Sequence, residues 1–391
     1  MSGPVIQGWC PGALRPMRSG DGLVVRVRPH LGRLTQAQAV GVAELAMRHG
    51  SGIIDLSARA NLQIRGVAET GHPPLIEGLR ALGLIDDSIA AETRRNIVVQ
   101  PFWSEGDATV TVAAALERAL AENDAPAPSA KFGYAVDCGE KPVLAETSAD
   151  IRIERLAGRL TVRADGALTA AQATQATAAK LALDLARWFL ASGGAPEGRG
   201  RMAAHLARGA VLPEAFRAIP VPRRQDVRLP CPGATPLGQL AAFAFGQIEA
   251  ETLSVLAETG PIRLTPWRML LIEGAACMPA VAGLVSDPES PLLRTTACTG
   301  APGCPQALIE TRELARRLSV GLRPAETLHV SGCAKGCAHP GAATFTLVGQ
   351  PGGKVAFIRD GTSRDAPHLP GLDSATLSPE HLTETTHVPH L

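Results

Sequence analysis

The hexapeptide Gly52-Ile53-Ile54-Asp55-Leu56-Ser57 recurs 208 positions later as Gly260-Pro261-Ile262-Arg263-Leu264-Thr265. The likeness continues at the same offset, through the pairs Leu62/Leu270, Ile64/Ile272 and Gly66/Gly274. A repeat of this kind indicates that a structural unit occurs twice in the chain. The 391 residues, 45% of them hydrophobic, are enough for two or three domains.

Two further matches support a duplication. The segment Cys10-Pro11-Gly12-Ala13 matches Cys231-Pro232-Gly233-Ala234, and residues 158–166 match residues 353–361. The second of these offsets, 195, also places Cys138 on Cys333. All the matches keep the same order, so we interpret the chain as two related halves joined by the proline-rich linker 213–236.

Hydrophobic periodicity in the first half predicts strands and a helix in mixed order. Residues 23–28 alternate as a half-buried strand, and Thr35-Gln36-Ala37-Gln38 is a capping box for a helix that Gly50 ends. Residues 59–66 predict another strand, and one of its faces would be polar. That face would carry Arg59, Asn61, Gln63 and Arg65, whereas its counterpart would carry Trp267, Met269, Leu271 and Glu273. We infer an α+β fold in which the first copy faces a ligand and the second is more structural, although an ordinary solvated strand face is the alternative.

Composition excludes some classes of function. The net charge of +1 and the 3% of aromatic residues argue against a nucleic-acid binder. Arginine outnumbers lysine 33 to five, which reflects general composition, or carboxylate binding by some of the arginines. The most apolar stretch, 269–285, is interrupted by Glu273 and Pro279, and the first residues do not resemble a signal peptide. We therefore expect a cytoplasmic protein without a membrane span.

Four of the eight cysteines lie within a 40-residue window, as Cys298-x5-Cys304 and, 28 residues later, Cys333-x3-Cys337. Four thiolates are the usual ligands of a 4Fe–4S cluster, whereas zinc sites usually have tighter pairs on both sides. Glycines near the four cysteines would let the backbone wrap closely around a cluster. Pro305 is expected to begin a helix, 305–318, whose N-terminus favours an anionic cluster. A zinc site and unligated cysteines remain the alternatives.

The other cysteines and the histidines carry weaker signals. We interpret Cys138 and Cys231 as buried small hydrophobes or as remnants of the duplication. His30, His49, His329 and His339 could each bind a metal, but none shows ligand spacing. The tail from Thr362 onward is rich in Pro, His and Thr, which predicts loose packing.

With these residues in view, the chain resembles the nitrite and sulfite reductase superfamily over about residues 10–361. The resemblance rests on the cysteine pattern, the duplicated halves, and residues 56–66, which look like the family's Thr-Thr-Arg-Gln-x-x-Gln segment. It implies two ferredoxin-like half-modules and two related mixed α/β lobes with pseudo-twofold symmetry. The expected units are 1–70 (first half-module), 71–222 (first lobe), 223–290 (second half-module) and 291–391 (cluster lobe with a loose tail).

The same resemblance implies a tetrapyrrole site and its ligands. Basic residues of the family bind tetrapyrrole carboxylates, and the matching positions here give a substrate-binding set of Arg26, Arg59, Gln63, Arg65, Arg95 and Lys131. The cluster ligands would be Cys298, Cys304, Cys333 and Cys337. Gly133 replaces the second lysine of the family's Lys-Phe-Lys run, which argues against sulfite or nitrite reduction. In the reductases the last cysteine also bridges the cluster to the haem iron, so Cys337 is expected beside the tetrapyrrole.

The segment Cys333-Ala334-Lys335-Gly336-Cys337-Ala338 looks like the precorrin-3B synthase branch of the superfamily. That resemblance implies an O2-dependent monooxygenase of cobalamin biosynthesis. It would convert precorrin-3A to precorrin-3B by meso-carbon hydroxylation and lactone formation, with electrons passing through the 4Fe–4S cluster. It further implies a mononuclear non-haem iron in place of sirohaem, and NADH or a reduced carrier protein as the electron source. A sirohaem-dependent sulfite or nitrite reductase, an electron-transfer iron–sulfur protein and a zinc-stabilised interaction protein are the alternatives.

Overall fold

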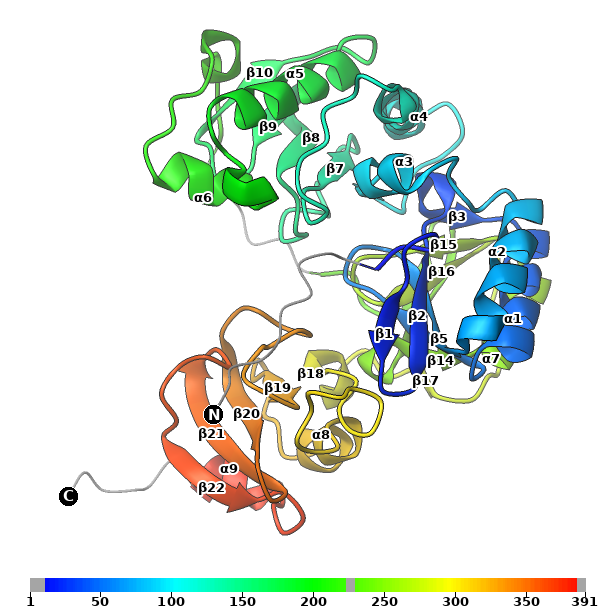
Figure 1. Cartoon of the computed structure of the whole chain (residues 1–391), viewed down its shortest axis with the longest axis vertical. Helices are drawn as coiled ribbons and strands as arrows, with labels where there is room; N and C mark the ends of the chain where they lie inside the picture. The colour runs from blue at the N-terminus through cyan, green and yellow to red at the C-terminus, as the bar shows by residue number, and fades with distance from the viewer. Residues whose placement is uncertain (1–10, 223–228, 385–391) are drawn as a thin grey trace.

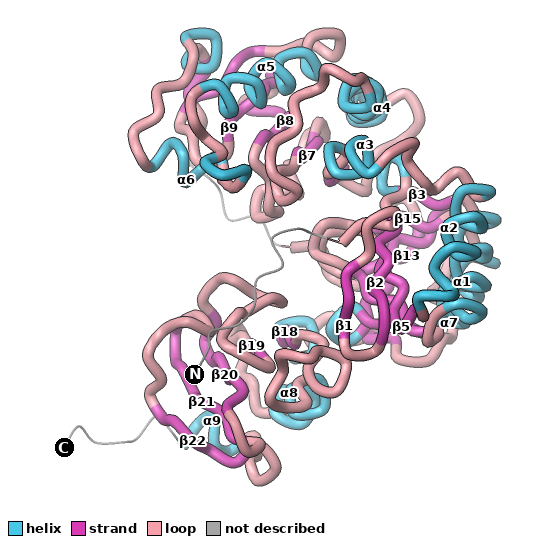
Figure 2. The backbone as a smooth tube through the Cα atoms, viewed as in Figure 1, coloured by secondary structure: helices cyan, strands magenta, loops and turns pink. Residues whose placement is uncertain are grey.

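The computed structural model describes residues 11–222 and 229–384. Its four sheets form a central pair flanked by two lobes (Figure 1). Runs of consecutive strands are interspersed with helices along the tube, as in an α+β fold (Figure 2). No helix in the described ranges combines the length and the apolar character that a membrane crossing needs.

The two central sheets have matching strand orders. The first has the order β1-β2-β5-β4-β14 and the second the order β12-β13-β16-β15-β3, with β17 on β13. The strands of the first are β1 (Met17–Ser19), β2 (Gly22–Val27), β5 (Leu62–Val67), β4 (Ile53–Leu56) and β14 (Gln247–Glu249). Those of the second are β12 (Gly233–Thr235), β13 (Gly238–Phe243), β16 (Met269–Glu273), β15 (Ile262–Leu264), β3 (Arg33–Leu34) and β17 (Leu284–Val285).

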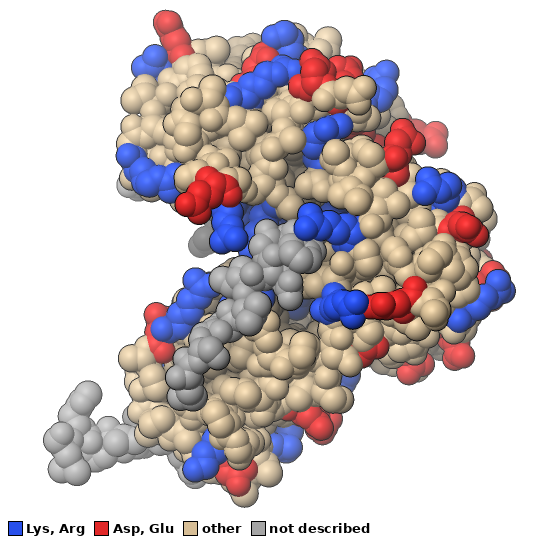
Figure 3. Space-filling model, in the orientation of Figure 1, with Lys and Arg blue, Asp and Glu red and all other residues tan. Residues whose placement is uncertain are grey.

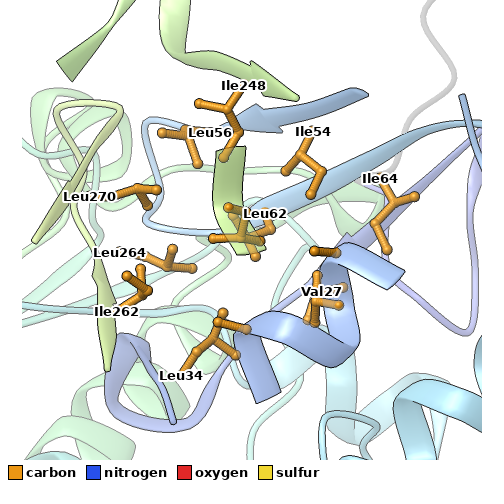
Figure 4. Close-up of a cluster of buried hydrophobic side chains, with 14 of the residues drawn as sticks. Val27, Leu34, Ile54, Leu56, Leu62, Ile64, Ile248, Ile262, Leu264 and Leu270 are labelled. Carbon is orange, nitrogen blue, oxygen red and sulfur yellow. The ribbon is translucent and has the colours of Figure 1, made fainter. Parts of the chain in front are cut away.

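Each central sheet takes its last strand from the other half of the chain. Strand β14 pairs with β4, and strand β3 pairs with β15. The covering helices are α1 (Gln36–His49), α2 (His72–Ala81) and α7 (Ala250–Thr259). Side chains from both halves, among them Leu34, Leu62, Ile248 and Leu270, form one core (Figure 4). The halves therefore share one hydrophobic core that neither completes alone.

The two lobes repeat a second sheet pattern, three parallel strands followed by antiparallel ones. The first lobe has the order β11-β10-β9-β8-β7-β6, and the second has the order β18-β19-β20-β21-β22. The first lobe contains β6 (Ile97–Val99), β7 (Tyr134–Asp137), β8 (Ile151–Leu156), β9 (Arg159–Ala164), β10 (Thr169–Gln172) and β11 (Ile219–Pro220), with α3 (Ile89–Arg94), α4 (Ala108–Ala121), α5 (Ala178–Ala191) and α6 (Met202–Ala207). The second contains β18 (Thr295–Ala297), β19 (Leu328–Ser331), β20 (Ala343–Gln350), β21 (Lys354–Gly361) and β22 (Leu369–Asp373), with α8 (Arg312–Ser319) and α9 (Glu380–Glu384).

The backbone carries further marks of duplication. Leu31 and Phe245 both have positive φ, at 55° and 60°, just before the exchanged strands β3 and β14. Ala60 and Arg268 also have positive φ, at 52° and 60°, in the turns that connect β4 to β5 and β15 to β16. A non-glycine residue rarely adopts this conformation, so its recurrence at matched positions supports the repeat independently of residue identity.

Several local expectations are confirmed or corrected. The capping box is present, with Thr35 accepting from the backbone N–H of Gln38 and the Gln38 side chain accepting in return. The polar strand begins at Leu62, because residues 57–61 form a turn that Ser57 Oγ holds by accepting from the N–H groups of Arg59 and Asn61. Arg59 therefore lies in a turn and not on a strand face.

Two expectations about the second half are wrong, and for Cys231 only the interpretation as a remnant of the duplication remains. The helix expected from Pro305 begins at Arg312, because residues 305–311 form turns around the cysteine loop. The tail is packed as far as Leu382, since β22 pairs with β21, and Leu377 and Leu382 are buried in the core of that lobe. Cys231 is exposed, whereas Cys138 is buried as expected. Cys10 lies outside the described residues.

The expected boundary at residue 70 is placed too early. Helix α2 follows it directly, and Leu75, Ile76 and Leu79 of that helix belong to the core of the central sheets. The first half-module therefore continues through α2. The other expected boundaries stay predictions.

Candidate iron–sulfur and tetrapyrrole site

The four cysteines of the spaced pairs come from two loops that the fold places side by side. Cys298 and Cys304 follow strand β18, and Cys333 and Cys337 follow strand β19. Because β18 and β19 are parallel neighbours, their carboxyl ends lie at the same edge of the sheet. The backbone N–H of Gly332 donates to Cys298 Sγ at 3.2 Å, which joins the two loops directly.

The chemistry of this donor set fits a cluster. Burial raises the pKa of the Cys333 and Cys337 thiols, and the charges of Cys298 and Cys304 act in the same direction. Four thiolates crowded in this way need a cationic core to compensate them, as the iron of a cluster would. Among the described residues, no group of three or more His, Cys, Asp or Glu, the four cysteines included, is already arranged to hold a metal ion.

Two glycines let the loops approach each other. A Cβ at Gly332 would meet the Cβ of Ala307 at 2.6 Å, and a Cβ at Gly336 would meet Ser363 Oγ at 2.3 Å. Gly336 also has a φ of 63°, which favours glycine. Larger residues would force the loops apart. Cys337 is exposed, whereas the other three cysteines are only partly so, which leaves its side of the site accessible.

The loop before Cys304 is clamped from the first half-module. The Gly303 carbonyl accepts from the N–H of Gly20 at 3.0 Å, from Ser19 Oγ and, at 3.4 Å, from Arg65 Nη2. The Arg65 guanidinium also binds Asp21 through Nε and Nη2, at 3.0 and 2.9 Å. Arg65 is therefore committed to a protein carboxylate and to the cysteine loop, and it is better assigned to positioning this loop than to a substrate.

A row of polar residues crosses the outer face of the first central sheet, with Arg26, Gln63, Asp55 and Gln247 at paired positions. In the amide orientation that satisfies both groups, the Gln63 side-chain oxygen accepts from Arg26 Nη2 at 2.7 Å. Asp55 accepts from Arg312 Nη2 at 2.8 Å and lies 3.7 Å from Arg65 Nε. The row therefore runs from the candidate ligand-binding residues to the helix of the cluster lobe.

The remaining basic residues of the predicted set separate into two groups. Arg59 Nη2 donates to the backbone oxygen of Lys131 at 3.0 Å, so the structure brings these two together between the central sheet and the first lobe. Arg95 instead donates to both oxygens of Asp86, at 2.7 and 2.8 Å, and to the carbonyl of Arg28. We therefore assign Arg95 to a buried structural ion pair.

Positive charge gathers where the surface is hollowed between the two lobes (Figure 3). A cationic hollow next to the cysteine lobe is suited to an anionic ligand of moderate size.

Sequence reasoning missed Arg268 beside the cysteines and named His329 only as one of four histidines without ligand spacing. Arg268 Nη2 donates to the carbonyl of Ala338, next to Cys337, at 2.9 Å. His329 lies on β19 with no exposed surface, and its ring is 5.6 Å from that of His339. Arg268 occupies the position of Ala60, so the duplication itself gave no signal for it. His329 could have been suspected only from its closeness to Cys333 along the chain.

Comparisons with known proteins agree with this geometry. The family model "Nitrite/Sulfite reductase ferredoxin-like half domain" matches residues 15–82. A precorrin-3B synthase of Sinorhizobium sp is 30% identical over 398 residues, which cover 92% of this chain and 84% of that protein. The chain belongs to the precorrin-3B synthase family of the nitrite/sulfite reductase superfamily.

The solved structure of the Mycobacterium tuberculosis NirA protein has the same fold as this member of the precorrin-3B synthase family. The two superpose with a TM-score of 0.66, covering 93% of this chain and 80% of that one, at 17% sequence identity. The expected α+β fold of the superfamily is therefore confirmed. The family implies an iron–sulfur cluster, and the two cysteine loops of the described structure are the candidate site for it.

Proposed function

We propose that the protein is the O2-dependent monooxygenase that converts precorrin-3A to precorrin-3B, by hydroxylating a meso carbon and forming a lactone. One observation carries the proposal, the likeness to a precorrin-3B synthase over nearly the whole chain. The paired cysteine loops beside a cationic hollow support it, because they supply an electron-transfer site and a binding site for a polycarboxylate.

Cys298, Cys304, Cys333 and Cys337 would hold a 4Fe–4S cluster. Such a cluster supplies single electrons when bound, which we propose come from NADH or a reduced carrier protein. The protein's own part is to hold the cysteine loops in place through Gly303 and to keep Cys337 on the exposed side. A mononuclear iron remains part of the proposal, but the described residues offer no ligand group for it.

The chain's basic residues would bind and orient the tetrapyrrole. Arg26, held by Gln63, presents its guanidinium on the outer face of the first central sheet. Arg59 and Lys131 would form a second contact point, where an arginine fork and an ammonium group can bind separate acetate or propionate arms. Fixing several arms of one rigid ring would select the carbon that is presented for oxidation.

Labelled oxygen tests the proposal directly. The protein would be purified anaerobically, reconstituted with iron and sulfide, and given precorrin-3A, a reductant and ¹⁸O2. The reductant supplies two electrons, so one ¹⁸O atom enters the product and the other leaves as water. We expect one ¹⁸O atom in the product by mass spectrometry. Product that carries oxygen from water, or no product from a reconstituted protein that binds precorrin-3A, would contradict the monooxygenase assignment.

A sirohaem-dependent sulfite or nitrite reductase is the second candidate, favoured by the fold shared with NirA. The same preparation would be supplied with reduced methyl viologen and sulfite or nitrite. Reduction of either anion, together with sirohaem in the visible spectrum, would replace the first proposal. Gly133 stands where a second lysine would help to bind those anions, so we expect neither activity.

A further inference from the structure

Arg268 differs from the buried arginines that the fold satisfies internally. Five of those have a carboxylate within ion-pair distance, namely Arg65, Arg95, Arg152, Arg163 and Arg263. Arg268 has no such partner among the described residues, and its one hydrogen bond there is from Nη2 to the Ala338 carbonyl. Burial lowers the pKa of Arg268 and the charge of Arg312 acts in the same direction, whereas the charge of Asp55 opposes both. A partly buried guanidinium that has no carboxylate within ion-pair distance among the described residues is a candidate for an external anion.

The local backbone is built to accommodate this arginine. Arg268 has a φ of 60°, and a Cβ at Gly246 would lie 2.6 Å from the Arg268 Cβ. A glycine at 246 is therefore needed for the arginine to lie where it does. The equivalent turn of the first half carries Ala60, so the guanidinium is specific to the second half.

His329 provides a second, independent sign of a ligand. The residue has no exposed surface, and within the described residues neither ring nitrogen has a hydrogen-bond partner. Arg268 and His339 are the charged groups that act on its ring. Buried polar atoms are almost always satisfied, so a pair of unsatisfied nitrogens calls for a missing partner. Arg268, a fixed cation that acts on this ring, disfavours a metal ion as that partner and favours an anion.

We propose that Arg268 and His329 form a binding subsite for a carboxylate of the tetrapyrrole substrate, on the Cys337 side of the cysteine loops. The inference rests on the proposed function and extends it, because the predicted substrate-binding residues all lie in the first half. The planar guanidinium can hold both oxygens of one carboxylate, and a ring N–H of His329 can donate to the same group. The contact of Arg268 with Ala338 places this anchor next to Cys337. A ring held from both halves would lie against that exposed cysteine.

Binding of uroporphyrin, a stable tetrapyrrole with acetate and propionate arms, tests the subsite. The reconstituted holoprotein would be titrated by fluorescence quenching as wild type, Arg268→Gln, Arg268→Lys and His329→Gln. We expect Arg268→Gln to raise Kd about tenfold or more, because it removes a charge-assisted hydrogen bond. Arg268→Lys should recover part of the affinity, and His329→Gln should raise Kd severalfold. Arg159→Gln, at an exposed position on the first lobe, is the matched control and should leave Kd unchanged.

The outcomes separate the subsite from the proposed function. Wild-type protein that does not bind uroporphyrin would overturn the tetrapyrrole assignment and the subsite with it. Wild-type binding with an unchanged Kd in Arg268→Gln and His329→Gln would overturn the subsite alone. A shifted reduction potential of the cluster with unchanged Kd would mean that Arg268 compensates the cluster's charge instead. Inorganic phosphate would also be added as a competitor of uroporphyrin. If phosphate displaces uroporphyrin equally from wild type and from Arg268→Gln, the subsite is supported. If phosphate displaces it from wild type but not from Arg268→Gln, Arg268 is a general anion site and the subsite is overturned.

Discussion

The two central half-modules have matching strand orders, but the outer face of the first sheet is polar and that of the second is largely apolar. The paired row Arg26, Gln63, Asp55 and Gln247 of the first sheet corresponds to Leu240, Leu271, Arg263 and Arg33 of the second. In the second sheet, Leu240 and Leu271 lie in an apolar cluster with Met269 and Val285. Duplication preserved the hydrogen-bonded register and the shared core, whereas the outer faces diverged into a polar face and a packed one.

The same comparison reveals an inverted ion pair. Asp55 and Arg65 of the first half occupy the positions of Arg263 and Glu273 in the second, so the charges are exchanged between matched sites. Each pair connects its sheet to a different lobe. Asp55 binds Arg312 of the cluster lobe, whereas Arg263 donates to the carbonyls of Pro101 and Trp103 in the first lobe, at 2.7 and 2.5 Å. At matched positions, the acidic Asp55 therefore contacts the cluster lobe and the basic Arg263 contacts the first lobe.

The largest expected effect distinguishes the two lobes. Cys333→Ser should abolish the visible absorbance of the reconstituted cluster, because one of four thiolate ligands is lost. Cys138→Ser, at the corresponding end of β7 in the first lobe, should leave that absorbance intact, since Cys138 is a buried thiol in an apolar core. Iron and sulfide analysis of both variants measures this. Equal cluster loss in both would remove the assigned difference between the lobes.

The next largest effect is expected from removing one partner of the matched ion pairs, Glu273 in the second half and Arg65 in the first. Glu273→Gln leaves Arg33 and Arg263 without their shared carboxylate and should lower the free energy of unfolding by about 4 kcal/mol. Arg65→Gln should cost a similar amount and also release Gly303. Urea unfolding measures the first effect, and the electron paramagnetic resonance spectrum of the reduced cluster measures the second. We expect the spectrum to change in Arg65→Gln and to stay as wild type in Glu273→Gln; the reverse would contradict the clamp.

Exchanging one residue between the outer faces should have a somewhat smaller effect. Leu271→Gln places an amide in a fully buried apolar cluster and should destabilise the protein by about 3 kcal/mol. Gln63→Leu should be nearly neutral for stability, but it removes the acceptor that holds Arg26 and should weaken uroporphyrin binding. Chemical denaturation and fluorescence titration of both variants test this. A stable Leu271→Gln would show that the second face is not packed as described.

The sequence predicted the duplication and the cysteine loops because both depend on local signals. Repeated hexapeptides, a capping box and a four-cysteine pattern can be recognised without knowing what lies opposite them in space. The α+β class followed from the same signals. The polar strand was predicted to start three residues too early. The turn before it has a positive φ at Ala60, and such turns are usually recognised in a sequence by a glycine, which is absent at this position.

Arginine roles could not be predicted in this way. Arg65 and Arg95 look like ligand-binding residues until Asp21 and Asp86 are found beside them. Arg268 gave no sign in the sequence, because its distinction is the lack of a carboxylate within ion-pair distance in the described structure. Pairing depends on which carboxylates the tertiary fold brings within hydrogen-bond distance, and residue spacing along one strand carries no information about that.

The smallest predicted effect concerns the ends of the matched strands β7 and β19, whose last residues are Asp137 and Ser331. Ser331 Oγ donates to the Cys333 carbonyl at 2.7 Å, whereas Asp137 Oδ2 accepts from the N–H groups of Val143 and Leu144, at 2.7 and 2.8 Å. The other oxygen of Asp137 has no hydrogen-bond partner among the described residues. Burial raises the pKa of Asp137 to about 6, although the two backbone N–H groups oppose the shift.

Because this folded-state pKa lies above the unfolded value, the unfolded chain releases the proton first as the pH rises. The stability of the folded state should therefore fall between about pH 4 and pH 6 and then level off, with a loss of about 2 kcal/mol. Asp137→Asn keeps an acceptor for Val143 and Leu144 but cannot ionise, so it should be more stable than wild type at pH 7 and equal to it near pH 4. Urea unfolding of both proteins across this range measures the difference. A gap that widens toward low pH would show that Asp137 is stabilised as a carboxylate, and that the two lobes differ less at this position than the structure indicates.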